Sequence, residues 1–398
     1  MTQSPLPVIR LLPKTKPQAI RRGYPWVYAN EVVTDRRTRA LAPGTIALLE
    51  DSDRAPMALV GVNPNSKIIA RVLDSAETGG VDRAWFATRL RKALSLRERL
   101  FTTPFYRLVH AEVDGLPGVI IDRFGDTAVI QPNAAWADVL LPDLAAALAE
   151  VTGVTTILKN AGGRGRSLEG LDGGDAVLLG PPPTAPIPVK MNGATYMADL
   201  LGGQKTGLFY DQRPNHAFAA RLSQGARVLD VFSHVGGFGL AALANGAVQA
   251  HCVDGSEAAL ALCAQGAAQM GAGDRVTTTK GDAFDVLTAL GEDSAEHDLV
   301  VCDPPAFAPS HKARDAGLRA YERIARLAAP LVSEDGYLVL CSCSHAVDLS
   351  AFTGACLRGI GRAGRRAQLI HTGHAGPDHP LLPQLAESGY LKALFFRL

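Results

Sequence analysis

Short runs rich in apolar and β-branched residues alternate with longer amphipathic segments over the C-terminal part of the chain. The runs of strand length lie at 228–232, 250–254, 276–279, 299–303 and 337–341. Between them, apolar positions recur at helical spacing over 238–245, 256–270, 283–290 and 316–332. Regular alternation of strands and helices is typical of a parallel sheet with helices on both faces. We therefore predict an α/β domain with a mostly parallel sheet here.

The first part of the chain has a different pattern. Up to about residue 73, strand-like runs such as 45–50 and 67–73 are separated by turn residues, among them Pro43-Gly44. This pattern predicts a small β-rich module. It is followed by a predicted α+β unit, with a helix over 82–100, hairpin strands at 107–112, 119–122 and 128–131, a helix over 135–150 and a strand at 155–159.

A stretch rich in glycine and proline, 162–188, is interpreted as the linker that leaves this unit. Beyond it, Asn192-Gly193 between two alternating runs predicts a tight hairpin. Pro214 suits the first turn of a helix. The expected domains are therefore 1–75 (β-rich), 76–180 (α+β) and 181–398 (α/β).

Composition narrows the class of protein. The chain has 398 residues, 47% of them hydrophobic, and a net charge of +1. It contains no long uncharged apolar run and does not start with a signal-peptide pattern, so we expect a soluble cytoplasmic protein. All six cysteines fall in the last third and no pair has CxxC spacing. We expect reduced thiols and no metal site.

A basic segment near the N-terminus indicates a nucleic-acid partner. The segment from Arg10 to Arg39 contains eight Arg and Lys residues but only two acidic ones, Glu31 and Asp35, and aromatic residues are interleaved with them. Such a segment suits phosphate contact combined with stacking. Arg21, Arg22 and Trp26 are the candidate RNA contacts. A second basic stretch, 83–99, is interpreted as the solvated face of a helix.

Acidic residues end or follow four of the predicted strands: Asp230, Asp254, Asp282 and Asp303. Ligands of open parallel sheets bind at this edge. After the first strand, the turn with Ser233 and Gly236-Gly237 lets a ligand approach the backbone. The dinucleotide pattern GxGxxG is absent. The acids instead suit a nucleoside without phosphate, and S-adenosylmethionine is the common one.

Cys343 is a candidate nucleophile. It lies just past the end of the predicted strand 337–341 and is followed by Ser344 and His345, whereas Cys252, Cys263 and Cys356 fall within elements and are expected to be buried. Asp303-Pro304-Pro305 holds a carboxylate at the end of another strand, because each proline fixes φ. A thiolate can add to carbon 6 of a pyrimidine and activate carbon 5. Phe307 is placed to stack on the base.

Five motifs, in order along the chain, resemble those of the bacterial 23S rRNA cytosine-C5 methyltransferases with an N-terminal PUA domain. They are 114–126, 204–213, 228–238, 303–307 and 342–344, and 22–28 resembles the opening signature of the PUA module. The resemblance implies a PUA domain, a central α+β domain and a Rossmann-like methyltransferase domain. It also implies S-adenosylmethionine as methyl donor, and 23S rRNA or the large ribosomal subunit as partner.

By position, the resemblance implies a role for each motif residue. Cys343 is the nucleophile and Asp303 orients the base. The implied donor contacts are Lys205, Thr206, Gly207, Tyr210, Asp211, Asp230, Ser233, Gly236, Gly237, Asp254, Asp282, Ala283 and Asp303. Other RNA cytosine-C5 methyltransferases place a second cysteine three residues after the motif acid. This chain has Ala306 there, as in the single-cysteine group.

Three alternatives stay open at this point. A related enzyme that methylates a guanine nitrogen also uses Asp-Pro-Pro but needs no thiol. An RNA-binding or ribosome-assembly factor could keep this fold without the chemistry. A dehydrogenase is the third, and it lacks the glycine pattern. The sequence also leaves open whether the protein is a monomer or a homodimer.

Overall fold

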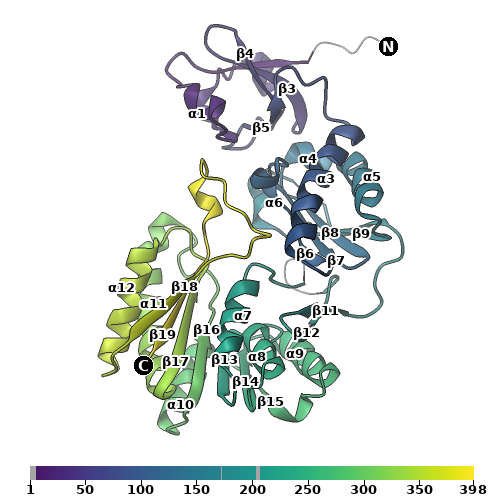
Figure 1. Cartoon of the computed structure of the whole chain (residues 1–398). Coiled ribbons are helices and arrows are strands. Elements are labelled where there is room, and N and C mark those ends of the chain that lie inside the picture. Colours follow the sequence, from purple (N-terminus) through teal and green to yellow (C-terminus); the bar gives the residue numbers. More distant parts are fainter. Residues whose placement is uncertain (1–5, 172, 203–206) are drawn as a thin grey trace. The chain divides into compact units, whose positions relative to one another are not determined.

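The structure is a computed structural model that describes residues 6–171, 173–202 and 207–398 (Figure 1). The chain divides into two compact units. The N-terminal unit comprises Met1–Thr184 and Asp378–Ser388, and the C-terminal unit comprises Ala185–Pro377 and Gly389–Leu398. None of the described helices has both the length and the apolar character needed to cross a membrane.

The N-terminal unit begins with a five-stranded sheet in the order β1-β3-β4-β5-β2. Its strands are β1 (Val8–Arg10), β2 (Trp26–Val27), β3 (Thr45–Glu50), β4 (Pro56–Val62) and β5 (Ala70–Ser75). Two short helices, α1 (Gln18–Arg21) and α2 (Arg36–Arg39), lie between β1 and β3. The predicted β-rich module is therefore confirmed. The strand expected at 67–73 starts at Ala70, because a turn bonded between Asn63 and Ile69 precedes it.

The second sheet of this unit has the order β10-β9-β8-β7-β6. Its strands are β6 (Phe105–His110), β7 (Val119–Phe124), β8 (Thr127–Pro132), β9 (Thr156–Lys159) and β10 (Ala176–Leu179). The helices α3 (Arg83–Leu100), α4 (Ala135–Val139) and α5 (Leu141–Thr152) pack with it around buried Phe86 and Trp136. The single helix expected over 135–150 is thus two helices.

The interpretation of 162–188 as a linker is wrong in part. The stretch contains helix α6 (Arg164–Leu168) and strand β10, which extends the second sheet by pairing antiparallel with β9. The buried Arg166 side chain anchors α6, because its Nη1 donates to the carbonyl oxygen of Pro132 at 2.6 Å and to Asp138 at 2.9 Å. The glycines in this stretch suggested a loop, because the contacts of Arg166 that hold α6 cannot be recognised from composition.

The C-terminal unit contains the predicted mostly parallel sheet, with seven strands in the order β15-β14-β13-β16-β17-β19-β18. The strands are β13 (Arg227–Val231), β14 (Gln249–Asp254), β15 (Val276–Lys280), β16 (His297–Cys302), β17 (Val332–Ser342), β18 (Gln368–Gly373) and β19 (Lys392–Arg397). Those from β13 to β17 pair parallel, and β19 lies antiparallel between β17 and β18.

Helices cover both faces of this sheet (Figure 1). They are α7 (Arg213–Arg221), α8 (Gly237–Ala244), α9 (Glu257–Gln269), α10 (Ala283–Glu292), α11 (Arg314–Ala328) and α12 (Leu349–Arg362). The last three bury Leu287, Tyr321 and Phe352 in one core with the sheet. The predicted hairpin precedes the sheet as β11 (Ile187–Met191) and β12 (Ala194–Ala198), and Asn192 and Gly193 have φ of 54° and 79°, as a type I′ turn requires.

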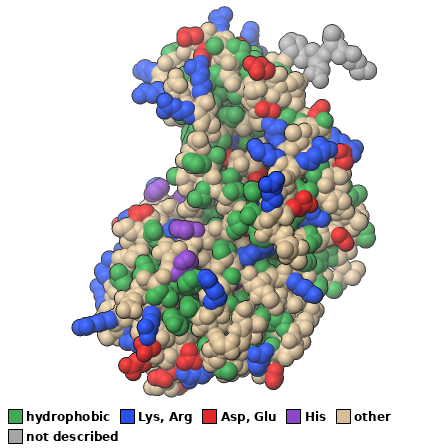
Figure 2. Space-filling model, in the orientation of Figure 1, with side chains coloured by type: hydrophobic (Ala, Val, Ile, Leu, Met, Phe, Trp, Pro, Cys, Tyr) green, Lys and Arg blue, Asp and Glu red, His purple; other side chains and the backbone are tan. Residues whose placement is uncertain are grey.

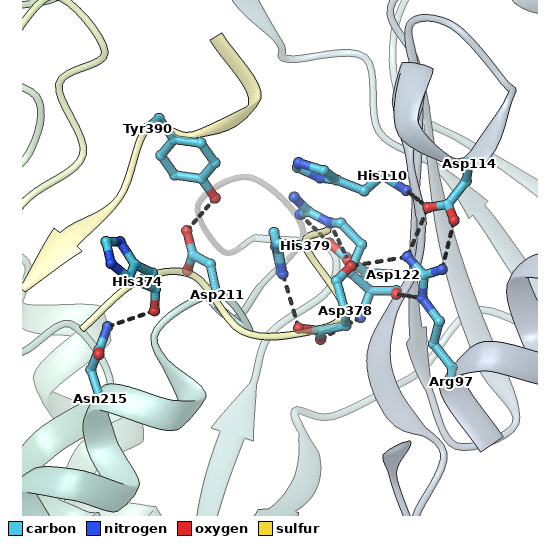
Figure 3. Close-up of polar contacts among 11 residues, drawn as sticks. Arg97, His110, Asp114, Asp122, Asp211, Asn215, His374, Asp378, His379 and Tyr390 are labelled. Carbon is cyan, nitrogen blue, oxygen red and sulfur yellow. Dashed lines mark hydrogen bonds and ion pairs between the residues drawn. The ribbon is translucent and has the colours of Figure 1, made fainter. Parts of the chain in front are cut away.

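Residues Asp378–Ser388, between β18 and β19, belong to the N-terminal unit (Figure 3). Asp378 is fully buried there and accepts hydrogen bonds from the backbone N–H of Arg107 at 3.1 Å and from His379 Nδ1 at 3.0 Å. Its carbonyl oxygen accepts a bond from Arg97, which also forms a bidentate ion pair with Asp114. No sequence pattern indicated this excursion of the chain.

Candidate active site

The turn from β13 into α8 is built on a buried carboxylate. Asp230 is fully buried and accepts hydrogen bonds from the N–H groups of Phe238 at 3.2 Å and Gly239 at 2.8 Å. Burial raises the pKa of Asp230 to about 7, although these two bonds oppose that shift. The carboxyl group therefore fixes the first turn of α8, and with it the loop at the end of β13.

Glycine is required at both Gly236 and Gly237. Gly236 has φ of 84°, and a Cβ atom there would lie 2.5 Å from the Cys263 sulfur. A Cβ atom at Gly237 would lie 2.8 Å from the His216 ring. The pair thus lets the turn pack closely against Cys263 and His216.

A pocket of about 510 Å³ lies at the ends of β13, β14 and β15. Its lining residues are Phe232, Val253, Asp254, Gly255, Lys280, Gly281, Asp282 and Ala283. The two Asp254 oxygens accept 2.8 Å hydrogen bonds from the N–H groups of His234 and Ser256, which leaves lone pairs for ligand hydroxyls. Asp282 caps α10 by accepting from Phe284. These residues fit a nucleoside with unmodified ribose hydroxyls.

Cys343 stands one residue beyond β17. All six cysteines lie in the described part of the chain, and Cys343 is the one that is not buried. Burial raises the pKa of the Cys302, Cys341 and Cys356 thiols, so these stay protonated at neutral pH. The Cys343 sulfur lies 4.0 Å from the carbonyl oxygen of Pro304. The thiol therefore faces the Asp-Pro-Pro segment.

Asp303 directly follows β16, the parallel neighbour of β17. The register pairs Cys302 with Leu340, so Asp303 is level with Cys341, two residues before Cys343. Its N–H donates to the carbonyl oxygen of Val231 at 3.1 Å, which ties the segment to β13. A thiol and a carboxylate thus project from adjacent strands at the same edge of the sheet.

A hydroxyl network lies behind the thiol. Ser342 donates to the Tyr321 hydroxyl oxygen at 2.8 Å, and Tyr321 and Ser344 share a further 2.8 Å hydrogen bond. Ser344 also accepts from the N–H of Ala308 at 3.0 Å. The residues on either side of Cys343 are therefore fixed to α11 and to the Asp-Pro-Pro loop.

The other residues expected at the site have varied positions. Lys205 and Thr206 lie outside the described residues. Tyr210 is buried, and Asp211 accepts a 2.6 Å hydrogen bond from the Tyr390 hydroxyl (Figure 3). Phe307 is part-buried, with its ring centroid 5.1 Å from that of Tyr321.

The candidate RNA contacts lie on the first sheet domain, whose surface carries many basic side chains (Figure 2). Arg22 is exposed, and Arg21 forms a 2.9 Å ion pair with Asp51. The Trp26 ring N–H donates to Glu112 at 2.8 Å, so this side chain connects the two domains of the N-terminal unit.

Sequence reasoning missed Tyr321 and Lys392, and it gave Ser342 no role although this residue belongs to the motif 342–344. Lys392 is buried and shares a face of β19 with the core residues Leu394 and Phe396. A lysine in phase with apolar residues of a strand was a readable signal, because lysine is rarely buried without a partner.

Two parts of the chain match families of known proteins. Residues 9–75 match a model of PUA-like domains, and residues 172–397 match the S-adenosylmethionine-dependent methyltransferase model. A ribosomal RNA large subunit methyltransferase of Deinococcus radiodurans is 33% identical over 95% of this chain and 94% of its own length. Ribosomal RNA large subunit methyltransferase I of Salmonella arizonae is 32% identical over 100% of both chains.

A solved structure shows the same fold. It is that of SMU.776, a putative methyltransferase complexed with SAH; its TM-score is 0.82 at 19% identity, over 99% of this chain and 100% of that one. The PUA domain, the central α+β domain and the Rossmann-like sheet therefore have the predicted architecture. The chain belongs to the family of S-adenosylmethionine-dependent methyltransferases that includes ribosomal RNA large subunit methyltransferase I.

Proposed function

We propose that this enzyme methylates carbon 5 of a cytosine in large-subunit ribosomal RNA, with Cys343 as the nucleophile. The observation that carries the proposal is that Cys343 is partly exposed beside the Asp303 segment, while the five other thiols are buried. The names of the relatives supply the RNA class, since they are ribosomal RNA large subunit methyltransferases.

In the proposed reaction, the Cys343 sulfur forms a bond to carbon 6 of the cytosine, which makes carbon 5 nucleophilic. The Asp303 carboxylate accepts a hydrogen bond from the exocyclic amine and holds the ring in place. S-adenosylmethionine supplies the methyl group that carbon 5 gains. Loss of the carbon 5 proton to a base then breaks the carbon–sulfur bond and returns Cys343 as thiolate.

The donor site in this proposal is the pocket at the ends of β13 to β15. Asp254 accepts hydrogen bonds from ribose hydroxyls, Asp282 and Ala283 border the base, and Gly236-Gly237 admits the donor to the backbone. Ser233 and the buried Asp230 hold that turn, the latter through its bonds to α8. Gly207, Tyr210 and Asp211 stay proposed donor contacts, although none of them lines this pocket.

Asp254→Ala is expected to weaken S-adenosylhomocysteine binding by about 10- to 100-fold, because each hydrogen bond to a charged group contributes about 1.5–3 kcal/mol. Isothermal titration calorimetry measures this change. Asp274→Ala, at an exposed acid of the same unit that does not line the pocket, is the control. Equal affinity of both variants for the ligand would place the donor elsewhere.

The RNA contact is proposed for the first of three domains, 1–75, 76–180 and 181–398. The domain 1–75 carries exposed arginines, among them Arg21 and Arg22, which suit phosphate contact (Figure 2). This assignment is supported by the match of residues 9–75 to PUA-like domains.

The deciding experiment uses large-subunit rRNA fragments in which cytosine is replaced by 5-fluorocytosine, incubated with enzyme and S-adenosylmethionine. Fluorine replaces the proton that must leave, so the carbon–sulfur bond persists. We expect a protein–RNA species that survives denaturation and maps to the peptide containing Cys343. Methylation of a guanine nitrogen without an adduct would instead identify the related guanine enzyme, and RNA binding without any methylation would identify an assembly factor.

A further inference from the structure

Lys392 is a buried lysine at the start of β19, with 5% of its surface exposed. Its register partner on β17 is Ser342, the residue directly before Cys343. Its Nζ atom donates two 2.8 Å hydrogen bonds, to the carbonyl oxygens of Ser344 and Val347. The ammonium group therefore holds the turn that carries the thiol.

A buried ammonium group is costly unless a negative charge compensates it. Within the described residues, Lys392 has no hydrogen bond or ion pair to a carboxylate. Burial lowers the pKa of Lys392, and the negative charges of Cys343 and Asp348 oppose that shift. Asp348 is largely exposed and already accepts from the N–H of Ala351 and pairs with Arg314. Cys343 is the remaining group that can supply a negative charge, in its thiolate form.

We propose that the buried ammonium group of Lys392 stabilises the thiolate form of Cys343 and fixes its position at the end of β17. Lys392 is then a positioning residue for the reaction, and this inference rests on the function proposed above. A compensating positive charge is needed because the Asp303 carboxylate on the neighbouring strand disfavours a second negative charge on Cys343.

Other titratable groups surround the same turn. They are Asp303 after β16, Tyr321 on α11, His311 before α11, and His345 and Asp348 between Cys343 and α12. The ring centroids of His311 and His345 are 6.3 Å apart. None of these groups changes in a Lys392 variant, so the difference between variant and parent isolates the lysine.

The test measures the rate at which iodoacetamide alkylates Cys343 as a function of pH, with the modified peptide quantified by mass spectrometry. In Lys392→Gln, the amide still donates hydrogen bonds but carries no charge. The midpoint of the alkylation profile should rise by about 1 pH unit or more, since an opposite charge at close range shifts such an equilibrium by that amount. Lys392→Arg should stay nearer to the parent.

Arg397→Met is the matched control, because Arg397 ends the same strand, pairs with Asp335 and is exposed. Its midpoint should equal that of the parent. Circular dichroism checks that each variant is folded, and Lys392→Met replaces Lys392→Gln if the latter is not. An unchanged midpoint in a folded neutral variant overturns the inference.

The outcomes separate this inference from the proposed function. If the parent forms the 5-fluorocytosine adduct while the midpoint of the neutral variant is unchanged, only the role of Lys392 is wrong. If the midpoint shifts but the parent forms no adduct, Lys392 acts on the thiol and the proposed reaction is wrong.

Discussion

Cys343→Ala is expected to lower the rate of RNA methylation on the order of 10³-fold or more, because carbon 5 is not nucleophilic until sulfur has added at carbon 6. The binding of RNA and of S-adenosylhomocysteine should persist, since the side chain is small and lies outside the donor pocket. Single-turnover transfer of a radiolabelled methyl group measures the chemical step, and filter binding measures RNA affinity.

The control for this variant is Cys356→Ala, which removes a buried thiol from α12. It should retain methylation, although its stability falls slightly. Ala306 makes the loss in Cys343→Ala more complete, because the position three residues after Asp303 offers no second thiol. A Cys343→Ala enzyme that methylates RNA at the parent rate would refute the covalent mechanism.

Arg97→Met is expected to lower the free energy of unfolding of the N-terminal unit by about 3–5 kcal/mol, because removing one partner of a buried ion pair leaves the other uncompensated. Arg97 is fully buried, and its guanidinium bonds Asp114 at 2.6 and 2.7 Å and the carbonyl oxygens of Arg107 and Asp378 at 3.0 Å (Figure 3). The variant leaves the Asp114 carboxylate without this partner.

Urea unfolding followed by tryptophan fluorescence measures this effect selectively. The chain has three tryptophans, Trp26, Trp85 and Trp136, and all belong to the N-terminal unit. Arg99→Met is the control, since Arg99 is exposed on the same helix and should change stability by no more than about 0.5 kcal/mol. Equal midpoints for the two variants would show that the buried ion pair does not stabilise the unit.

The sequence predicted the α/β sheet closely because its signals are local. Strands β13, β14 and β16 each contain a short apolar run, β15 is a run of β-branched residues, and Asp230, Asp254, Asp282 and Asp303 lie in these strands or within two residues of their ends. The parallel arrangement then brings strand ends to one edge. The proximity of Cys343 to the Asp303 segment followed from that rule without any knowledge of side-chain contacts.

The features that were missed depend on partners distant in the sequence. The buried Arg166 holds α6 through Asp138 and Pro132, and the glycines around it suggested only a linker. Lys392 contacts carbonyl oxygens of Ser344 and Val347, more than forty residues earlier. Contacts between residues so far apart in the sequence cannot be predicted from the spacing of apolar residues, because that spacing indicates only the face of an element on which a residue lies.

Asp378–Ser388 also sets the order in which the molecule can be completed during synthesis. A nascent chain folds from its N-terminal end as it leaves the ribosome. Arg97 and Arg107 are made early, yet their partner Asp378 lies 281 and 271 positions later. Arg97 therefore lacks its hydrogen bond to Asp378 until most of the C-terminal unit has been translated, and the N-terminal unit cannot complete its core before then. A gene divided after Thr184 would separate Arg97 from Asp378, and the first fragment would lack part of its own core.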